Sequence, residues 1–209
     1  MSRIESKLED LRRQSCEHMM TIKKLCETDY ANDVKNFDYL TERLQILGEK
    51  FACCIRDFAI KTYSMKRCEV YDNAAEMQGI EINKEGNKIV IDLPFLLPRK
   101  KDKDAKFIGD PLRYKFEKMT EYQELKIEEK VVVCIIHVYD NVNRKARCYD
   151  YDNLESKRIL DIIALYTMID DSPQYCDVYQ TVKFSDVDKT RVIVMPEKEF
   201  WALKNSGDF

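Results

Sequence analysis

The first 67 residues carry the pattern that most constrains this fold. Residues 3 to 67 contain one glycine and no proline, and their apolar residues recur at helical intervals. In two stretches the spacing alternates between four and three residues, which keeps one apolar seam along a helix. The seams are Ile4, Leu8, Leu11, Ser15, His18, Ile22 and Leu25, and then Phe37, Leu40, Leu44, Leu47, Phe51, Cys54 and Phe58. Between them TDYAND offers capping side chains, so this region is predicted to be an antiparallel helical hairpin.

The rest of the chain has a different pattern. GIEINKEGNKIVIDLPF predicts a β-hairpin, EKVVVCIIHVYD a buried strand, and residues 178–184 and 190–195 two more strands joined by SDVDK. Helices are predicted over residues 110–130, with Asp110 as N-cap and Pro111 at the first helical position, and over residues 154–169. The order β-β-α-β-α-β-β predicts an α+β fold, a mixed β-sheet with packed helices over residues 71–209, preceded by an α-helical hairpin domain over residues 1–70.

Composition narrows the possible functions. Lys and Arg (35) nearly balance Asp and Glu (38), so any binding to nucleic acid needs a local basic patch. The eight cysteines are scattered without a C-x-x-C pair, and the two histidines lie far apart, which disfavours a zinc site and histidine-centred catalysis. Neither a signal peptide nor an apolar run of about 18 residues is present, so a cytoplasmic protein without membrane contact is expected.

Carboxylates stand at both ends of the predicted helix in YDYDNLESKRILDIIALYTMIDDSPQ. Asp150 and Asp152 are two apart in an extended segment, so their side chains can share a side of the chain. Asp171 follows the helix. Because a straight helix over residues 153–169 would separate its ends by ~25 Å, the three carboxylates can meet only if the helix is shorter and the chain turns back.

A structural explanation of the same residues is also open. Asp152 followed by Glu155 matches a capping box at a helix N-terminus. The segment Asp170-Asp171-Ser-Pro has the composition of an ordinary turn. Under this interpretation the carboxylates carry no chemistry.

Two basic segments are candidates for contact with DNA backbone. One is PRKKDKDAKF and the other is NVNRKARCY. Either could instead be a solvated loop, which is the usual role of a charge run. Their candidate DNA-binding residues are Arg99, Lys100, Lys101, Arg144, Lys145 and Arg147.

Taken in order, several motifs resemble one known family. They are IVIDLPFLLP, VVVCIIHV, NRKAR, Asp150-Tyr-Asp152-Asn153, Lys157, Asp161 and Asp170-Asp171-Ser-Pro-Gln174. This set, over about residues 78 to 196, resembles the RusA family of Holliday junction resolvases, which are Mg²⁺-dependent endonucleases common on prophages. Asp152 also stands 19 residues before Asp171, the interval usual in that family.

The resemblance implies a function and a site. Asp150, Asp152 and Asp171 would be catalytic ligands of Mg²⁺, with Mn²⁺ as a possible substitute, and Lys157 would stabilise charge at the phosphate. Asn153 and the basic loop would bind branched DNA, and the protein would act as a homodimer in DNA recombination and repair. This chain departs from the family in four ways: Ser156 takes the family lysine position, Pro173 displaces Gln174, the basic loop is sparser than the family's arginine-rich run, and the coiled-coil-like hairpin has no counterpart.

Those departures leave a second class of function open. The protein would be a catalytically inactive RusA-like DNA-binding or adaptor protein, whose helical hairpin mediates oligomerisation or docks a protein partner. A third possibility, a non-specific or flap-type nuclease, would share the same site and differ in the shape of its DNA substrate.

Overall fold

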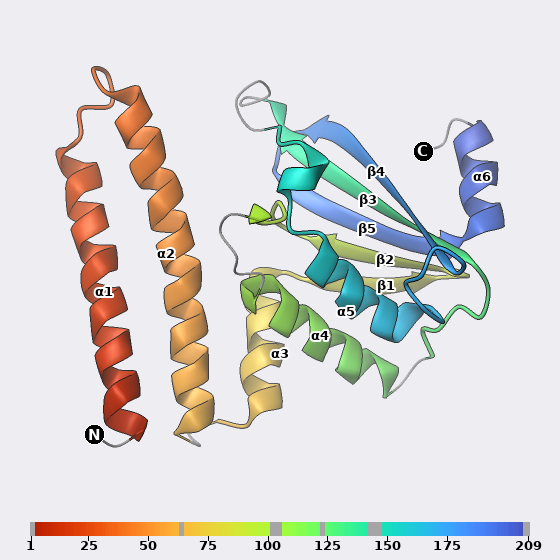
Figure 1. Cartoon of the computed structure of the whole chain (residues 1–209), viewed down its shortest axis with the longest axis horizontal. Helices are drawn as coiled ribbons and strands as arrows, with labels where there is room; N and C mark the ends of the chain where they lie inside the picture. Colours follow the sequence, from red (N-terminus) through yellow and green to blue (C-terminus); the bar gives the residue numbers. More distant parts are fainter. Residues whose placement is uncertain (1–2, 63–64, 101–105, 122–123, 142–147, 207–209) are drawn as a thin grey trace. The chain divides into compact units, whose positions relative to one another are not determined.

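The structure, a computed structural model, describes every residue except 1–2, 63–64, 101–105, 122–123, 142–147 and 207–209 (Figure 1). The chain divides into two compact units, residues 1–71 and 72–209. No helix of the described ranges combines the length and the apolar composition that a membrane crossing requires.

The first unit contains the predicted antiparallel hairpin, formed by α1 (Arg3–Glu27) and α2 (Val34–Lys61). Asp33 caps α2, because its Oδ1 accepts a hydrogen bond from the Asn36 backbone N–H at 3.3 Å. Across the hairpin the rings of His18 and Phe51 meet in a T-shaped arrangement, with 6.2 Å between their centroids. The prediction of two helices that pack along their seams is therefore confirmed.

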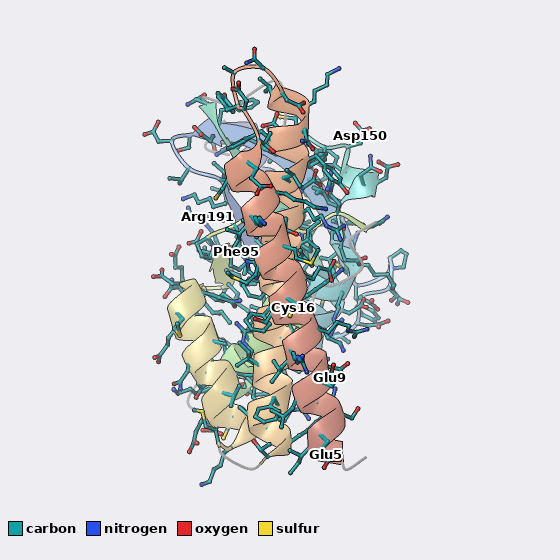
Figure 2. The ribbon with its side chains drawn as sticks, turned by 90° about the vertical axis from the view of Figure 1, so that its left-hand side faces the viewer. Glu5, Glu9, Cys16, Phe95, Asp150 and Arg191 are labelled. Atoms are coloured by element: carbon teal, nitrogen blue, oxygen red, sulfur yellow. The ribbon has the colours of Figure 1, made fainter. Side chains whose placement is uncertain are left out.

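The two helices cover the seam unevenly. Leu40 and Leu47 are buried, whereas Ile4 and Leu8 at the start of α1 are each 50% exposed. The exposed side chains of Glu5, Glu9 and Cys16 mark a polar face of α1 (Figure 2). The seam of α2 is therefore better buried at Leu40 and Leu47 than the seam of α1 is at its start.

The second unit is built around one five-stranded sheet. Its strands are β1 (Glu81–Glu85), β2 (Lys88–Leu93), β3 (Val131–Asp140), β4 (Cys176–Ser185) and β5 (Lys189–Pro196). Their order is β1-β2-β5-β3-β4, and the β3–β4 pair is parallel while the others are antiparallel. The mixed sheet with packed helices confirms the predicted α+β class.

Helices cover the two faces of this sheet to different extents. The helices are α3 (Arg67–Gln78), α4 (Lys106–Thr120), α5 (Lys157–Thr167) and α6 (Glu197–Ser206). α4 and α5 lie side by side across one face (Figure 1), where Leu112, Phe116 and Ile163 complete the main core with Val133. α6 covers part of the other face through Phe200.

Helix α4 differs from its prediction at both ends. It begins at Lys106, not after Asp110, and ends at Thr120. Pro111 therefore lies inside the helix, where it cannot donate to the carbonyl of Phe107. The side-chain amide of Gln78 donates to that carbonyl at 2.9 Å, in place of the N–H that proline lacks.

The strands predicted on either side of SDVDK are present, but they do not pair with each other. β3 lies between β4 and β5, parallel to β4 and antiparallel to β5. The connection passes the end of β3, where the Asp140 backbone N–H donates to Asp188 Oδ1 at 2.7 Å. Both edges of the apolar strand β3 are consequently paired.

Candidate functional site

The D-x-D motif lies in a short turn before α5. Residues Tyr151–Asn153 form a single 3₁₀ turn, η3, in which Asn153 N–H donates to the Asp150 carbonyl at 2.9 Å. The side chains of Asp150, Asp152 and Asn153 are exposed, and the next residue, Leu154, is buried in the main core. The turn therefore presents its polar residues to solvent and is anchored through Leu154.

The capping-box explanation of these residues is wrong. α5 begins at Lys157, and its N-cap is Ser156, which makes no side-chain capping bond. Asp152 lies four residues before that N-cap, too far to accept from the first helical N–H groups in the way the motif requires.

Aromatic contacts place this turn against the second half of β3. The Tyr151 ring stacks on the His137 ring, with centroids 5.6 Å apart and planes at 26°. The Tyr149 backbone N–H donates to the Tyr139 hydroxyl at 3.4 Å. Burial raises the pKa of the Tyr139 hydroxyl, and the bond from Tyr149 opposes part of that rise.

Asp171 lies at the opposite end of the same strand. It belongs to the turn before β4, where the Tyr175 carbonyl accepts from the Val131 N–H at 2.9 Å at the start of β3. A hydrogen bond from Ser172 holds the pKa of the neighbouring Asp170 below its ordinary value. Asp171 itself donates its backbone N–H to Asp170 Oδ1 at 3.0 Å.

The lengths of strand β3 and of helix α5 both show how far Asp171 lies from the D-x-D motif. From Val131 to His137 the strand rises about 20 Å at ~3.3 Å per residue. α5, which connects the two carboxylate segments, has 11 residues and is about 16 Å long at ~1.5 Å per residue. The helix is shorter than predicted, but the chain after it does not turn back, and the two segments lie at opposite ends of α5 (Figure 1).

The predicted metal centre is therefore not assembled. Within the described residues, which include all three aspartates, no group of three or more His, Cys, Asp or Glu side chains is placed to hold a metal ion. The expectation that Asp150, Asp152 and Asp171 meet is corrected by this geometry. These residues do not fit a Mg²⁺ ion held by three carboxylates.

Lys157 points along α5. Its ammonium forms an i,i+4 ion pair with Asp161 at 3.6 Å, and its side chain is 80% exposed. Such a pair contributes a few tenths of a kcal/mol to helix stability, roughly 0.3–0.5. The ion pair explains Lys157 and Asp161 as residues of the helix surface.

The structure does bring one predicted basic residue to the D-x-D turn. Arg99 forms a β-bridge with Leu154, and the Glu155 N–H donates to the Pro98 carbonyl at 2.8 Å. The Arg99 guanidinium lies over the Tyr149 ring, 5.2 Å from its centroid. Lys100 is next to it and exposed. The other predicted cations, Lys101, Arg144, Lys145 and Arg147, lie outside the described residues.

The sequence patterns do not indicate a group of polar side chains in the sheet, His137, Gln180 and Thr190, of which His137 lies under Tyr151. His137 Nε2 lies 3.2 Å from Gln180 Oε1, and burial lowers the pKa of His137 although this hydrogen bond raises it in part. His137 Nδ1 and Thr190 Oγ1 are buried without a hydrogen-bond partner in the described part of the chain, and the two residues are opposite each other in the β3–β5 pair. A single histidine within an apolar strand does not predict a buried polar cluster. Tyr149 and Tyr151, two residues apart beside the D-x-D motif, are the sequence feature that could have predicted an aromatic contact there.

Two of the solved structures to which this chain is similar are domains of MotB. One is the periplasmic domain of Helicobacter pylori MotB (residues 90–256), with 9% identity and a TM-score of 0.35, covering 62% of this chain and 90% of that one. The other is the periplasmic domain of MotB (residues 64–256), with 9% identity and a TM-score of 0.32, covering 61% and 76%. Similarities this weak support no inference about function. No curated protein matches the sequence.

One family model matches the sequence over residues 1–206, and it is described as a family of unknown function, DUF6100. Its description does not mention resolvases, so the resemblance to RusA proteins stays a prediction. The match runs through both the helical hairpin and the α+β unit. This chain therefore belongs to the DUF6100 family.

Proposed function

We propose that this protein binds nucleic acid through its phosphate backbone and does not cleave it. The observation that carries the proposal is the contact of Arg99 with Tyr149 and Leu154. Arg99 belongs to the basic segment PRKKDKDAKF, and Tyr149 is the last residue of the basic segment NVNRKARCY. Their contact therefore brings one end of each segment together.

Charge and aromatic surface together suit such a ligand. The net charge of -3 offers no general attraction to DNA, so a local cluster of cations must supply it. The guanidinium of Arg99 lies over an aromatic face, and a guanidinium is a planar donor group suited to a phosphate. Tyr151, two residues after Tyr149 in the chain and 39% exposed, offers a ring on which a base can stack.

The exposed carboxylates of the same turn argue against catalysis. Asp150 and Asp152 have no third carboxylate with which to hold a cation in the described structure. Without a cation they repel a phosphate, so they limit affinity. The effect of neutralising Asp150 and Asp152 therefore distinguishes the two cases. If they hold a metal ion, neutralising them abolishes cleavage; if they do not, it strengthens the binding of DNA.

The test is binding of a fluorescein-labelled four-way junction, linear duplex and single strand, measured by anisotropy across a salt series. We expect Arg99→Gln to weaken binding and to reduce the slope of log K against log[salt] by about 0.9 for each phosphate that the variant no longer neutralises. Lys198→Gln, which removes the same charge from exposed α6, is the matched control and should leave the slope unchanged. Absence of binding to every probe at low salt would overturn the proposal.

Cleavage is measured on the same junction with Mg²⁺ or Mn²⁺. We expect no nicks, and tighter binding when Asp150 and Asp152 are both changed to Asn, because the repulsion of phosphate is removed. Symmetric nicks that disappear in Asp152→Asn and Asp171→Asn would instead establish a resolvase. The expectation that the hairpin docks a partner stays a separate prediction.

A further inference from the structure

The two edge strands of the sheet differ in how they are protected. β1 has five residues, EINKE, and Lys84 also reaches across to the Glu124 carbonyl at 2.6 Å. Short length and charge are the usual means by which proteins prevent an edge strand from pairing with another chain. β1 therefore has the features of a closed edge.

β4 has the opposite properties. It has ten residues and pairs with β3 in a register without interruption from Cys176 to Ser185, so no bulge disturbs it. Within the described residues β4 is the last strand of the sheet, and its outer side pairs with no strand. Val178 is 47% exposed and Phe184 is 37% exposed. A long and regular edge that exposes apolar side chains is a site for the addition of a strand.

The sequence of β4 is complementary to itself in one antiparallel register. A two-fold axis at Gln180 pairs residues equally spaced on either side of it. Asp177 then faces Lys183 twice, once on each side of the axis, and Val178 faces Val182. Moving the axis to Tyr179 or Thr181 places Lys183 opposite a tyrosine and removes the charge pair.

Both charged residues are accessible for this pairing. Lys183 is exposed. Asp177 contacts Lys130 at 2.6 Å, but its side chain remains 50% exposed, so the carboxylate can accept from a second ammonium. Opposite charges directly across a strand pair stabilise it, and like charges destabilise it.

We propose that β4 is a self-association surface, on which the β4 strand of a second copy of this chain pairs antiparallel about Gln180. The two sheets would then form one continuous ten-stranded sheet through an isologous contact. This inference does not depend on DNA binding, because Arg99 and the D-x-D turn take no part in it.

The experiment is sedimentation equilibrium of the full chain over a range of concentrations. We expect a dimer that Lys183→Asp weakens at least about tenfold, since two attractive pairs become repulsive. Asp177→Lys should do the same, and the double variant with both changes should restore the dimer. Glu81→Lys on β1 is the matched control and should not change the mass.

Folding is checked separately by circular dichroism, because Asp177→Lys also breaks the contact with Lys130. If that variant does not fold, Val178→Lys replaces it, since it places a charge opposite Val182 without touching Lys130. A monomer at every concentration would overturn the proposal. So would a dimer that none of these changes weakens. The binding of DNA per chain is measured in Lys183→Asp as well. If it is unchanged while the dimer is lost, self-association and DNA binding are separate properties of the protein.

Discussion

His137 shows how one polar residue is held within the apolar strand β3. Its ring is completely buried, stacked under Tyr151 and hydrogen-bonded to Gln180. Burial is the largest influence on the ring and disfavours its charged form, so the pKa of His137 is lowered from 6.5. The folded protein therefore keeps this histidine neutral where an exposed histidine would be protonated.

This lowered pKa makes stability dependent on pH. By about pH 7.5, one unit above the ordinary histidine pKa of about 6.5, neither state binds a proton at this residue, so its contribution is constant. As the pH falls through about 6.5, the unfolded chain binds a proton that the folded chain rejects, and the free energy of unfolding decreases. We expect the urea midpoint to fall between pH 7.5 and 5.5, and to fall less in His137→Phe, which keeps the aromatic contact with Tyr151. Equal slopes for both proteins would contradict this assignment.

At the scale of elements, the end of α3 depends on backbone conformation. Gly79 has φ +69, and the N–H of Ile80 donates to the Ala75 carbonyl at 3.0 Å, which closes the helix. A Cβ at Gly79 would meet Pro94 at 3.5 Å, an ordinary contact. The cost of replacing this glycine is therefore conformational and not steric.

Gly48 offers a matched comparison, since it lies within α2 and a Cβ there would meet His18 at 3.6 Å without a clash. We expect Gly79→Ala to lower the free energy of unfolding by about 1–2 kcal/mol. Gly48→Ala should raise it by up to about 1 kcal/mol, because alanine favours a helix interior. Urea unfolding followed by circular dichroism measures both, and effects of the same sign would contradict this account.

At the scale of the whole molecule, the main core belongs to one unit. Its buried residues run from Ala75 to Val194, all beyond the hairpin. The only tryptophan, Trp201, lies in α6, where its ring contacts Phe200. Trp201 fluorescence consequently reports on the α+β unit.

We expect a chain that lacks residues 1–62, and keeps α3 complete, to fold. Its urea midpoint by Trp201 fluorescence should match that of the full chain, because no main-core residue has been removed. Refolding and far-ultraviolet circular dichroism serve as controls for native structure. A decrease of more than about 1 kcal/mol in the free energy of unfolding would be large for a change outside the core. It would show that the hairpin stabilises this unit.

Local patterns are sufficient to predict most elements. The 4-3 spacing defines the hairpin helices, and runs such as VVVCIIHV mark β3. These patterns fail where a distant partner compensates for an unfavourable residue. Pro111 predicts the start of a helix, because nothing in the chain reveals that Gln78 satisfies the carbonyl of Phe107.

Local patterns do not predict how the elements are arranged in space. β4 and β5 are expected to pair because they are neighbours in the chain, but β3 is apolar on both faces and bonds to a strand on each edge, which places it between them. The spacing of Asp152 and Asp171 matches a known motif, yet the packing of Tyr151 on His137 and the hydrogen bond between Val131 and Tyr175 hold the two aspartates at opposite ends of β3. Residue order and period therefore specify helices and strands, because these depend on neighbours in the chain. Which residues meet depends on burial and hydrogen bonding between distant segments.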